Sequence, residues 1–115
     1  IHRRILLQTK TLILTPRYLV ELSDDICAII PLPEVLWIYD HAAMRRTIKG
    51  RQLSYTIHVV TMKGEEYTLT GKSHREVSAI YHELNTRYPN FFFGYSKEHQ
   101  EMVQYVLHEM KNEKT

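Results

Sequence analysis

Residues 11–41 constrain the fold more than any other part of the chain, because they divide into short apolar runs separated by turn-forming residues. Pro16 interrupts the first run, since proline has no amide hydrogen and pushes the preceding residue into extended geometry. A polar Ser-Asp-Asp turn at residues 23–25, and then Pro31 and Pro33, separate the runs that follow. Apolar runs of about four to eight residues between such breaks are typical of β-strands. This stretch therefore predicts several short strands joined by tight turns.

A second strand pattern follows at residues 53–70, where large apolar residues alternate with polar ones on both sides of Lys63-Gly64. The dipeptide suits a turn, so the segment predicts an antiparallel hairpin. Alternate residues of a strand share one face, and we expect the apolar face to lie on the core. Its members are Leu53, Tyr55, Ile57, Val59, Tyr67 and Leu69. His58 falls on the opposite, solvent-facing register.

The last third of the chain predicts two helices. Ser73 and Glu76 have the spacing of a capping box at a helix N-terminus, and a second helix is expected to begin at Ser96. The apolar stripe of the first helix consists of Val77, Ile80, Tyr81 and Leu84. The stripe of the second consists of Met102, Val103, Val106, Leu107 and Met110. The predicted fold class is α+β, with six to seven short antiparallel strands followed by two C-terminal helices.

Composition limits the class of protein. The 115 residues are enough for one domain, 1–115, and the content of 43% hydrophobic and 24% charged residues is typical of a globular protein. A formal net charge of +2 does not indicate a nucleic-acid partner. The single cysteine, Cys27, cannot form an internal disulfide. Both Cys27 and Trp37 lie in apolar runs, and we interpret them as core residues.

The sequence carries no signal peptide and no apolar stretch of about 18 residues, so it predicts no membrane-spanning segment of its own. It begins with Ile1 instead of Met, and we interpret it as a piece of a larger protein. The first twenty residues contain four basic residues and no acidic one. If a membrane helix precedes them, this bias predicts a cytoplasmic domain that is tethered through segments outside the chain.

The sequence contains no recognisable catalytic or metal-binding motif. No two of the seven histidines have the i, i+4 spacing of a helical metal site, although ligands from two different helices remain an open alternative. The sequence contains no nucleophile elbow and no phosphate-binding glycine loop. Asp40 and His41 are neighbours, but adjacent residues of a strand point to opposite faces. We therefore expect a protein that is not an enzyme and that holds neither a metal nor a cofactor.

A basic segment at residues 41–51 is the first candidate binding site. It contains Arg45, Arg46, Lys49 and Arg51 and no acidic residue, and its irregular pattern with Gly50 predicts an exposed loop. Such a loop can bind phosphate groups or an anionic membrane surface. The alternative is a solvated loop without a ligand, because runs of charge are common on protein surfaces.

An aromatic connector at residues 91–95 is the second candidate. Phe91, Phe92 and Phe93 cannot all point inward from an extended segment, and Tyr95 follows them closely. Exposed aromatic residues indicate an interface with a protein partner or a membrane. The alternative is that the helices and the sheet cover the whole connector as part of the core.

Several phrases of the sequence resemble bacterial pleckstrin-homology-like (PH-like) domains: ILTPRYLVEL, then IIPLPEVLWIY, then a basic segment, a hairpin and a helix. Thr15 and Arg17 correspond, with a shifted spacing, to a Thr-x-x-Arg turn between early strands of those families. The IIPL phrase at residues 29–32, followed by Val35, corresponds to a motif that precedes a long strand. The closing FGYS at residues 93–96 resembles uncharacterised Firmicutes-type domains of this kind.

The resemblance covers roughly residues 11–110 and implies a bent antiparallel β-barrel or sandwich of about seven strands, plugged by a C-terminal helix. The second helix is a departure from that pattern. Eukaryotic relatives often bind phosphoinositide headgroups through a basic loop between the first strands. Here the densest basic segment comes later, after Trp37-Ile38-Tyr39, so no binding residue is carried over from those relatives.

Together these patterns predict a non-catalytic PH-like interaction module at the cytoplasmic membrane surface of a larger bacterial protein. A second hypothesis is a protein–protein or self-association module that uses the aromatic connector and the outer helix. A small enzyme is a third, and it would require a pocket of converging polar groups. The expected partners are an anionic membrane surface, an unidentified protein or a second copy of the chain, and not a nucleic acid.

Overall fold

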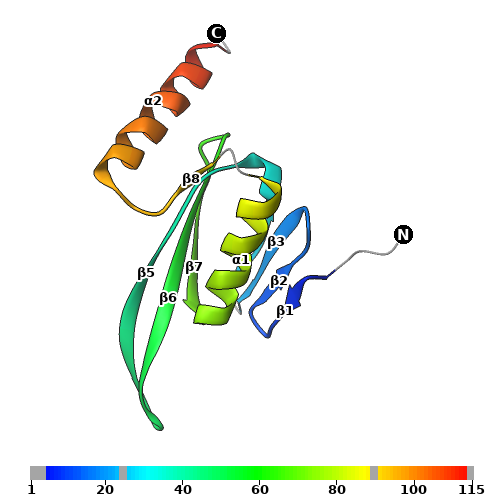
Figure 1. Cartoon of the computed structure of the whole chain (residues 1–115), viewed down its shortest axis with the longest axis vertical. Helices are drawn as coiled ribbons and strands as arrows, with labels where there is room; N and C mark the ends of the chain where they lie inside the picture. Colours follow the sequence, from blue (N-terminus) through cyan, green and yellow to red (C-terminus); the bar gives the residue numbers. More distant parts are fainter. Residues whose placement is uncertain (1–4, 24–25, 89–90, 114–115) are drawn as a thin grey trace.

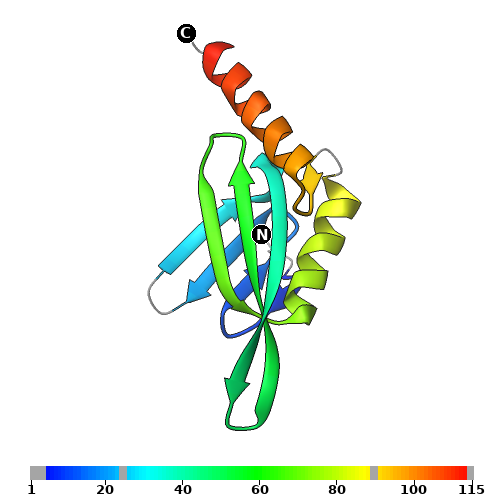
Figure 2. The same ribbon diagram turned by 90° about the vertical axis from the view of Figure 1, so that its left-hand side faces the viewer.

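The computed structural model of the protein describes residues 5–23, 26–88 and 91–113. These residues form two four-stranded sheets and two helices (Figure 1). Helix α1 lies against the sheets, whereas helix α2 lies at one end of the molecule, next to the end of the second sheet (Figures 1 and 2). The predicted α+β class is confirmed. The sheets do not join into a closed barrel.

The first sheet is a meander in the order β1-β2-β3-β4 with every pair antiparallel. Its strands are β1 (Leu7–Gln8), β2 (Leu12–Leu14), β3 (Tyr18–Ser23) and β4 (Ile26–Pro31). The predicted break at Pro16 is the β2–β3 turn, where the amide of Tyr18 donates to Thr15 Oγ1 at 3.0 Å. Residues 24–25, and the side chain of Cys27, lie outside the described part of the structure.

The second sheet has the order β7-β6-β5-β8. After a short 3-10 turn, η1 (Leu32–Glu34), its strands are β5 (Val35–Thr47), β6 (Gly50–Thr61), β7 (Glu66–Lys72) and β8 (Phe92–Phe93). The predicted hairpin at residues 53–70 is formed by β6 and β7 and is confirmed. Strand β8 pairs with β5 and runs parallel to it.

Three sequence predictions about these strands are wrong. Residues 41–51 are not a loop, because β5 continues to Thr47 and β6 begins at Gly50. The strands are also not uniformly short, since β5 has 13 residues and β6 has 12. The described residues contain eight strands instead of six to seven, because β8 inserts between the helices. Pairing with a neighbouring strand imposes extended geometry on residues 41–47 and 50–51 although their sequence shows no strand period.

Helix α1 (His74–Arg87) begins with the predicted capping box. The hydroxyl of Ser73 accepts from the amide of Glu76 at 3.2 Å, and Glu76 Oε1 accepts from the amide of Ser73 at 2.9 Å. The helix buries one face against both sheets, and this inner core is almost entirely aliphatic. Its members include Leu12, Leu14, Leu19, Ile30, Ile38, Ile57, Val59, Leu69, Val77, Ile80 and Leu84.

Polar contacts connect the first sheet to the start of α1. Lys72 is buried and donates to Glu21 Oε1 at 2.7 Å and to the carbonyl of Thr11 at 3.2 Å. Glu76 Oε2 accepts from the hydroxyls of Thr9 at 2.7 Å and Thr11 at 3.1 Å. Burial raises the pKa of Glu76, but the hydrogen bonds from Thr9, Ser73 and Thr11 outweigh it and hold this pKa below its usual value. Lys72 therefore joins the two sheets, and Glu76 joins α1 to the turn between β1 and β2.

Helix α2 (Lys97–Glu113) covers part of the outer face of the second sheet. Leu36, Trp37, Val60 and Val103 form a buried outer cluster there, so Trp37 is a core residue as predicted. The predicted helical stripe is only partly covered, because Met102 is 49% exposed while Val103 is 1% exposed. The inner core and the outer cluster therefore lie on opposite faces of β5 and β6.

Candidate functional site

The outer halves of β5 and β6 form a two-stranded ribbon at residues 41–54, called here the basic hairpin. Pairing of β7 with β6 ends where Lys72 meets Tyr55, and pairing of β8 with β5 covers only Trp37 and Ile38. Beyond these limits β5 and β6 pair only with each other, and the ribbon extends past the other strands, away from α2 (Figures 1 and 2). All of residues 41–53 are exposed. The hairpin is thus a projecting arm attached to a packed body.

A two-residue turn closes the tip of the hairpin. Thr47 pairs with Gly50, and the hydroxyl of Thr47 donates to the carbonyl of Gly50 at 2.8 Å. Gly50 has a φ of 115°, which glycine adopts without the steric strain of a side chain. The turn residues are Ile48 and Lys49, and the side chain of Ile48 is fully exposed at 106%. The most prominent point of the arm is therefore an aliphatic side chain next to a cation.

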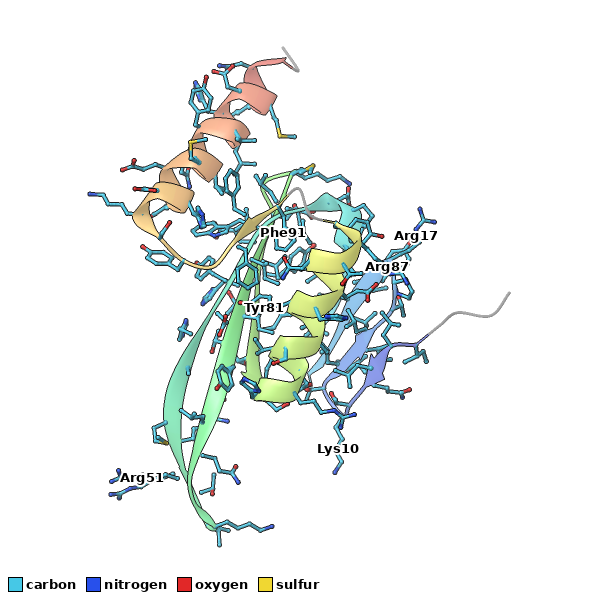
Figure 3. All side chains as sticks on the ribbon, in the orientation of Figure 1. Lys10, Arg17, Arg51, Tyr81, Arg87 and Phe91 are labelled. Atoms are coloured by element: carbon cyan, nitrogen blue, oxygen red, sulfur yellow. The ribbon has the colours of Figure 1, made fainter. Side chains whose placement is uncertain are left out.

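The four predicted basic residues all lie on this arm and are exposed: Arg45, Arg46, Lys49 and Arg51. Arg46 lies directly opposite Arg51 across the two strands. Figure 3 shows Arg51 on the outer part of the ribbon, away from the helices. Like charges in opposite positions repel each other. No acidic residue occurs from residue 41 to residue 64 to offset them. An anion placed between these guanidinium groups would relieve the repulsion.

Exposed apolar residues lie on the face of the arm that also carries Arg46 and Arg51. Met44 lies opposite Leu53, and the two are 59% and 54% exposed. The strand period places them on the face that is buried farther along, at Ile38 and Val59. In the described part of the structure, no other element packs on this face beyond the end of α1. Leu53, predicted to face the core, therefore has the predicted register but lies outside the core.

A strip of stacked rings occupies the opposite face, at the base of the arm. Tyr39 lies between Trp37, with ring centroids 4.4 Å apart, and His58, with centroids 4.7 Å apart. His58 Nε2 is 3.3 Å from His41 Nδ1. Burial and the nearby His41 lower the pKa of His58. His58 lies on the face opposite Ile57 and Val59, as its predicted register requires, and its ring is partly covered by Tyr39.

Asp40 lies on the inner face, against α1. Tyr81 donates a hydrogen bond from its hydroxyl to Asp40 Oδ1, and Figure 3 shows Tyr81 on the side of α1 that faces the sheet. Burial and this hydrogen bond raise the pKa of Tyr81. Asp40 and His41 therefore point to opposite faces, as predicted, and they do not act together.

The aromatic connector divides between the two faces of the sheet. Phe91 packs on the inner core, and Phe93 meets Tyr81 edge-on at 4.4 Å while remaining 43% exposed. Phe92 joins the outer cluster. Tyr95 lies over Trp37 at 6.0 Å and is 62% exposed. These four residues are not one patch, and the two most exposed flank Gly94 at the end of β8.

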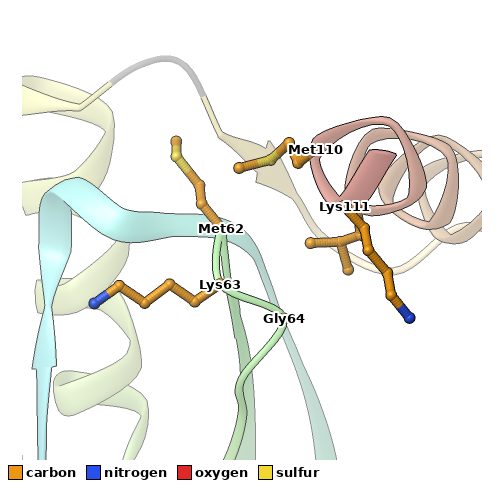
Figure 4. Close-up of a pocket in the computed structure, with 6 residues that line it drawn as sticks. Met62, Lys63, Gly64, Met110 and Lys111 are labelled. Atoms are coloured by element: carbon orange, nitrogen blue, oxygen red, sulfur yellow. The ribbon is translucent and has the colours of Figure 1, made fainter. Parts of the chain in front are cut away.

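A cleft that the sequence did not predict separates α2 from the β6–β7 turn (Figure 4). Its volume is about 250 Å³, and its walls are Met62, Lys63, Gly64, Leu107, Met110 and Lys111. Lys63 forms an ion pair with Glu34 of η1 at 3.0 Å. The lining contains two lysines and no carboxylate, hydroxyl or thiol side chain. Methionine side chains make it adaptable in shape.

Two further properties concern the part of the chain that the structure describes. No group of three or more His, Cys, Asp or Glu side chains is placed there to hold a metal ion, and the His41–His58 pair has no third such ligand. Neither helix is long and apolar enough to cross a membrane.

Comparison with known proteins adds a family. No curated protein and no solved structure matches the chain. Residues 8–103 match a family described as Domain of unknown function (DUF6709). The match runs from the end of β1 into α2 and includes the whole basic hairpin. Since it spans well over half of the 115 residues, the protein belongs to the DUF6709 family.

Proposed function

We propose that this chain is a non-catalytic, PH-like interaction module that docks on an anionic membrane surface through the basic hairpin. One observation carries the proposal: Ile48, fully exposed, projects beyond the body between cations on both strands of an arm without acidic residues. An aliphatic tip flanked by cations suits the boundary between lipid headgroups and acyl chains. The rigid body then acts as the support that presents this tip.

Charge and apolar burial both contribute to such docking. Each cation close to an anionic bilayer contributes about 1 kcal/mol, and this attraction decreases beyond the Debye length of about 8 Å. The hairpin supplies four cations within a few residues of its tip. Insertion of Ile48, with Met44 and Leu53 behind it, removes apolar surface from water. We therefore expect reversible binding that weakens as the salt concentration rises.

The PH-like part of the proposal is supported by the order of the elements. A four-stranded meander comes first, then the strands β5, β6 and β7, and then α1 packed between the sheets. This is the sequence of strands and helix that the resemblance implies. Strand β8 and helix α2 are additions to it. A bacterial protein with this module at the cytoplasmic face would meet anionic lipid there.

Vesicle flotation tests the proposal. Wild type should float with vesicles rich in phosphatidylglycerol and not with pure phosphatidylcholine vesicles. The variant with Arg45, Arg46, Lys49 and Arg51 all changed to Ala should lose at least tenfold in partition coefficient. A matched control changes four exposed cations elsewhere: Lys10, Arg17, Arg75 and Lys97.

Both variants carry the same formal net charge, since removing four positive charges from +2 gives −2. The control should retain binding within about threefold if the position of the cations matters, because only charges within a Debye length of the surface contribute fully. Ile48→Ser should weaken binding without changing net charge. Equal losses in the two quadruple variants, or no flotation of wild type, would reject the proposal.

A second candidate function is a protein-binding or self-association module that uses the aromatic connector and α2. The partial exposure of Tyr95, Met102 and Tyr105, each between 49% and 62%, favours it. Sedimentation velocity of the variant Met102→Ser/Tyr105→Ser provides the test. Loss of a concentration-dependent dimer in this variant would support α2 as the interface, and an unchanged dimer would count against it.

A further inference from the structure

The free edge of β5 is the feature that carries a further inference. One side of β5 pairs with β6 from Val35 to Thr47, with one irregularity at Leu36. On the other side, β8 covers only Trp37 and Ile38. The part of the chain that the structure describes supplies no strand to the remainder of this edge, from Tyr39 to Thr47. Unpaired strand edges are templates for pairing with another strand.

The backbone pattern shows which residues face the free edge. The carbonyl of Ile38 accepts from the amide of Gly94 at 2.8 Å, so Ile38 directs its backbone groups away from β6. This direction alternates along a strand in an antiparallel ladder. The residues with outward backbone groups beyond Ile38 are therefore Asp40, Ala42, Met44 and Arg46. They span about 20 Å at roughly 3.4 Å per residue.

We propose that two copies of the chain pair antiparallel through this edge, about a two-fold axis at Ala43. In this register Asp40 lies opposite the partner's Arg46, and Ala42 lies opposite the partner's Met44. Each of these residue pairs occurs twice, as the two-fold symmetry of an isologous interface requires. Opposite charges in facing positions stabilise a strand pair, and Asp40 is an acid at the base of an otherwise acid-free arm.

Neighbouring registers lack this complementarity. A shift of two residues in one direction places Arg46 opposite the partner's Ile38, whose edge β8 already covers. A shift in the other direction places two Met44 residues together and leaves Asp40 opposite Ile48. The register centred on Ala43 also places small side chains at the axis, where the two backbones approach most closely.

The same register covers side chains that the single chain leaves exposed. The tip of each hairpin reaches the end of the partner's β8. Ile48 then lies beside Phe93 and Tyr95, which are 43% and 62% exposed in one copy. The four facing positions form about eight backbone hydrogen bonds. An interface of this size is expected to be transient, with a Kd of about micromolar or weaker.

Disulfide trapping tests the register. Cys27→Ser removes the one natural cysteine, and Ala43→Cys then places a cysteine at the axis. Facing residues at a non-hydrogen-bonded position have Cβ atoms about 4.5–5.5 Å apart, which permits a disulfide with little movement. Ser54→Cys is the matched control, since Ser54 is the cross-strand neighbour of Ala43 but lies one strand farther from the axis. Ala43→Cys should oxidise to a dimer in high yield and Ser54→Cys should not.

Ala42→Pro tests the edge itself. Proline removes one outward amide without removing a hydrogen bond to β6, and it leaves all four cations and Ile48 in place. Sedimentation velocity should show a dimer for wild type at high concentration and a monomer for Ala42→Pro at the same concentration. The variant Met102→Ser/Tyr105→Ser should retain the dimer. A circular dichroism spectrum like that of wild type establishes that Ala42→Pro is folded.

The pairing is rejected if wild type stays monomeric up to about millimolar concentration, at which even a weak interface associates. It is also rejected if the two cysteine variants cross-link equally, or if folded Ala42→Pro dimerises like wild type. These outcomes do not decide the membrane proposal, which is tested independently. Ala42→Pro should float with anionic vesicles at least as well as wild type, because it keeps the basic tip and frees it from the partner.

Discussion

The inner and outer halves of the β5–β6 ribbon have the same backbone pairing and opposite surroundings. In the inner half, Ile38, Ile57 and Val59 are completely buried between α1 and the first sheet. In the outer half, every residue from 41 to 53 is exposed. Pairing is continuous from Trp37 with Val60 to Thr47 with Gly50. The two halves therefore differ in which side chains they carry and in whether other elements bury them. They do not differ in their backbone pairing.

The inner half of the ribbon contributes to the stability of the fold, whereas the outer half is free to carry residues for binding. The inner half is fixed by burial, so its residues are selected by size and shape. The outer half contributes little burial and can carry Arg46, Arg51 and Ile48 without disturbing the core. A two-stranded ribbon is only marginally stable alone. It projects here because the inner half sets its register and direction.

Lys72 marks the boundary between the halves, and its removal should have the largest effect. Lys72→Ala leaves the buried carboxylate of Glu21 without its ion-pair partner. Breaking a buried pair on one side costs about 3–5 kcal/mol. Urea unfolding should show this loss, and Lys72→Met combined with Glu21→Leu should recover most of it. A loss below about 1 kcal/mol for Lys72→Ala would mean that the pair does not fasten the sheets.

Ile57 and Leu53 compare the two halves directly, because they lie on the same strand and the same face. Ile57→Ala removes a fully buried side chain and should lower the free energy of unfolding by about 2–5 kcal/mol. Leu53→Ala changes a side chain that is 54% exposed and should stay within about 0.5 kcal/mol of wild type. Similar losses in urea unfolding would show that the outer half is packed against something in solution.

Glu76 gives the inner half a pH dependence. Hydrogen bonds hold the folded-state pKa of its carboxyl below the unfolded value of about 4.5. A lowered folded pKa adds stability that is complete above the unfolded pKa and is lost as the pH falls through the folded pKa. Glu76→Gln should therefore cost about 1 kcal/mol at pH 7. Unfolding measured from pH 7 to pH 3 should show the difference shrinking below about pH 4.5.

Exposed Glu66 provides the matched control for this measurement. Glu66→Gln should change the free energy of unfolding little at any pH in the range. A difference between wild type and Glu76→Gln that stays constant down to pH 3 would contradict the assigned role of the carboxylate.

Shortening the hairpin should have the smallest effect on stability. Replacing residues 44–53 by Asn-Gly joins Ala43 to Ser54 through a two-residue turn, which suits this facing pair as it suits Thr47 and Gly50. The free energy of unfolding should change by less than about 1 kcal/mol, because the removed side chains are exposed. Vesicle flotation should be lost at the same time. A large destabilisation would show that the arm supports the body.

The sequence predicted those elements whose conformation is determined by residues close together in the chain. Ser73 and Glu76 specified the start of α1, and the alternation through Ile57 and Val59 specified the register of β6. Pro16 marked a turn that does form. In each case a short-range rule and the final packing favour the same structure.

The sequence did not predict the outer half of β5, because its extended geometry comes from pairing and not from propensity. Ala42, Ala43 and the arginines have no strong preference for strands, and Ile48-Lys49 is not a usual turn dipeptide. A signal was nonetheless present: folding residues 42–55 back on themselves at Ile48-Lys49 pairs Met44 with Leu53 and Arg46 with Arg51. Contacts between distant segments, such as Lys72 with Glu21, had no local signal.

The position of Trp37 has a practical consequence. It is the one tryptophan of the chain, and its indole Nε1 donates to the carbonyl of Gly94 at 2.9 Å beneath Tyr95. Its fluorescence therefore reports on the junction between β5, β8 and the connector without any added label. Release of β8 would expose the indole to water and shift its emission to longer wavelength, whereas rearrangements confined to the far tip would leave the spectrum unchanged.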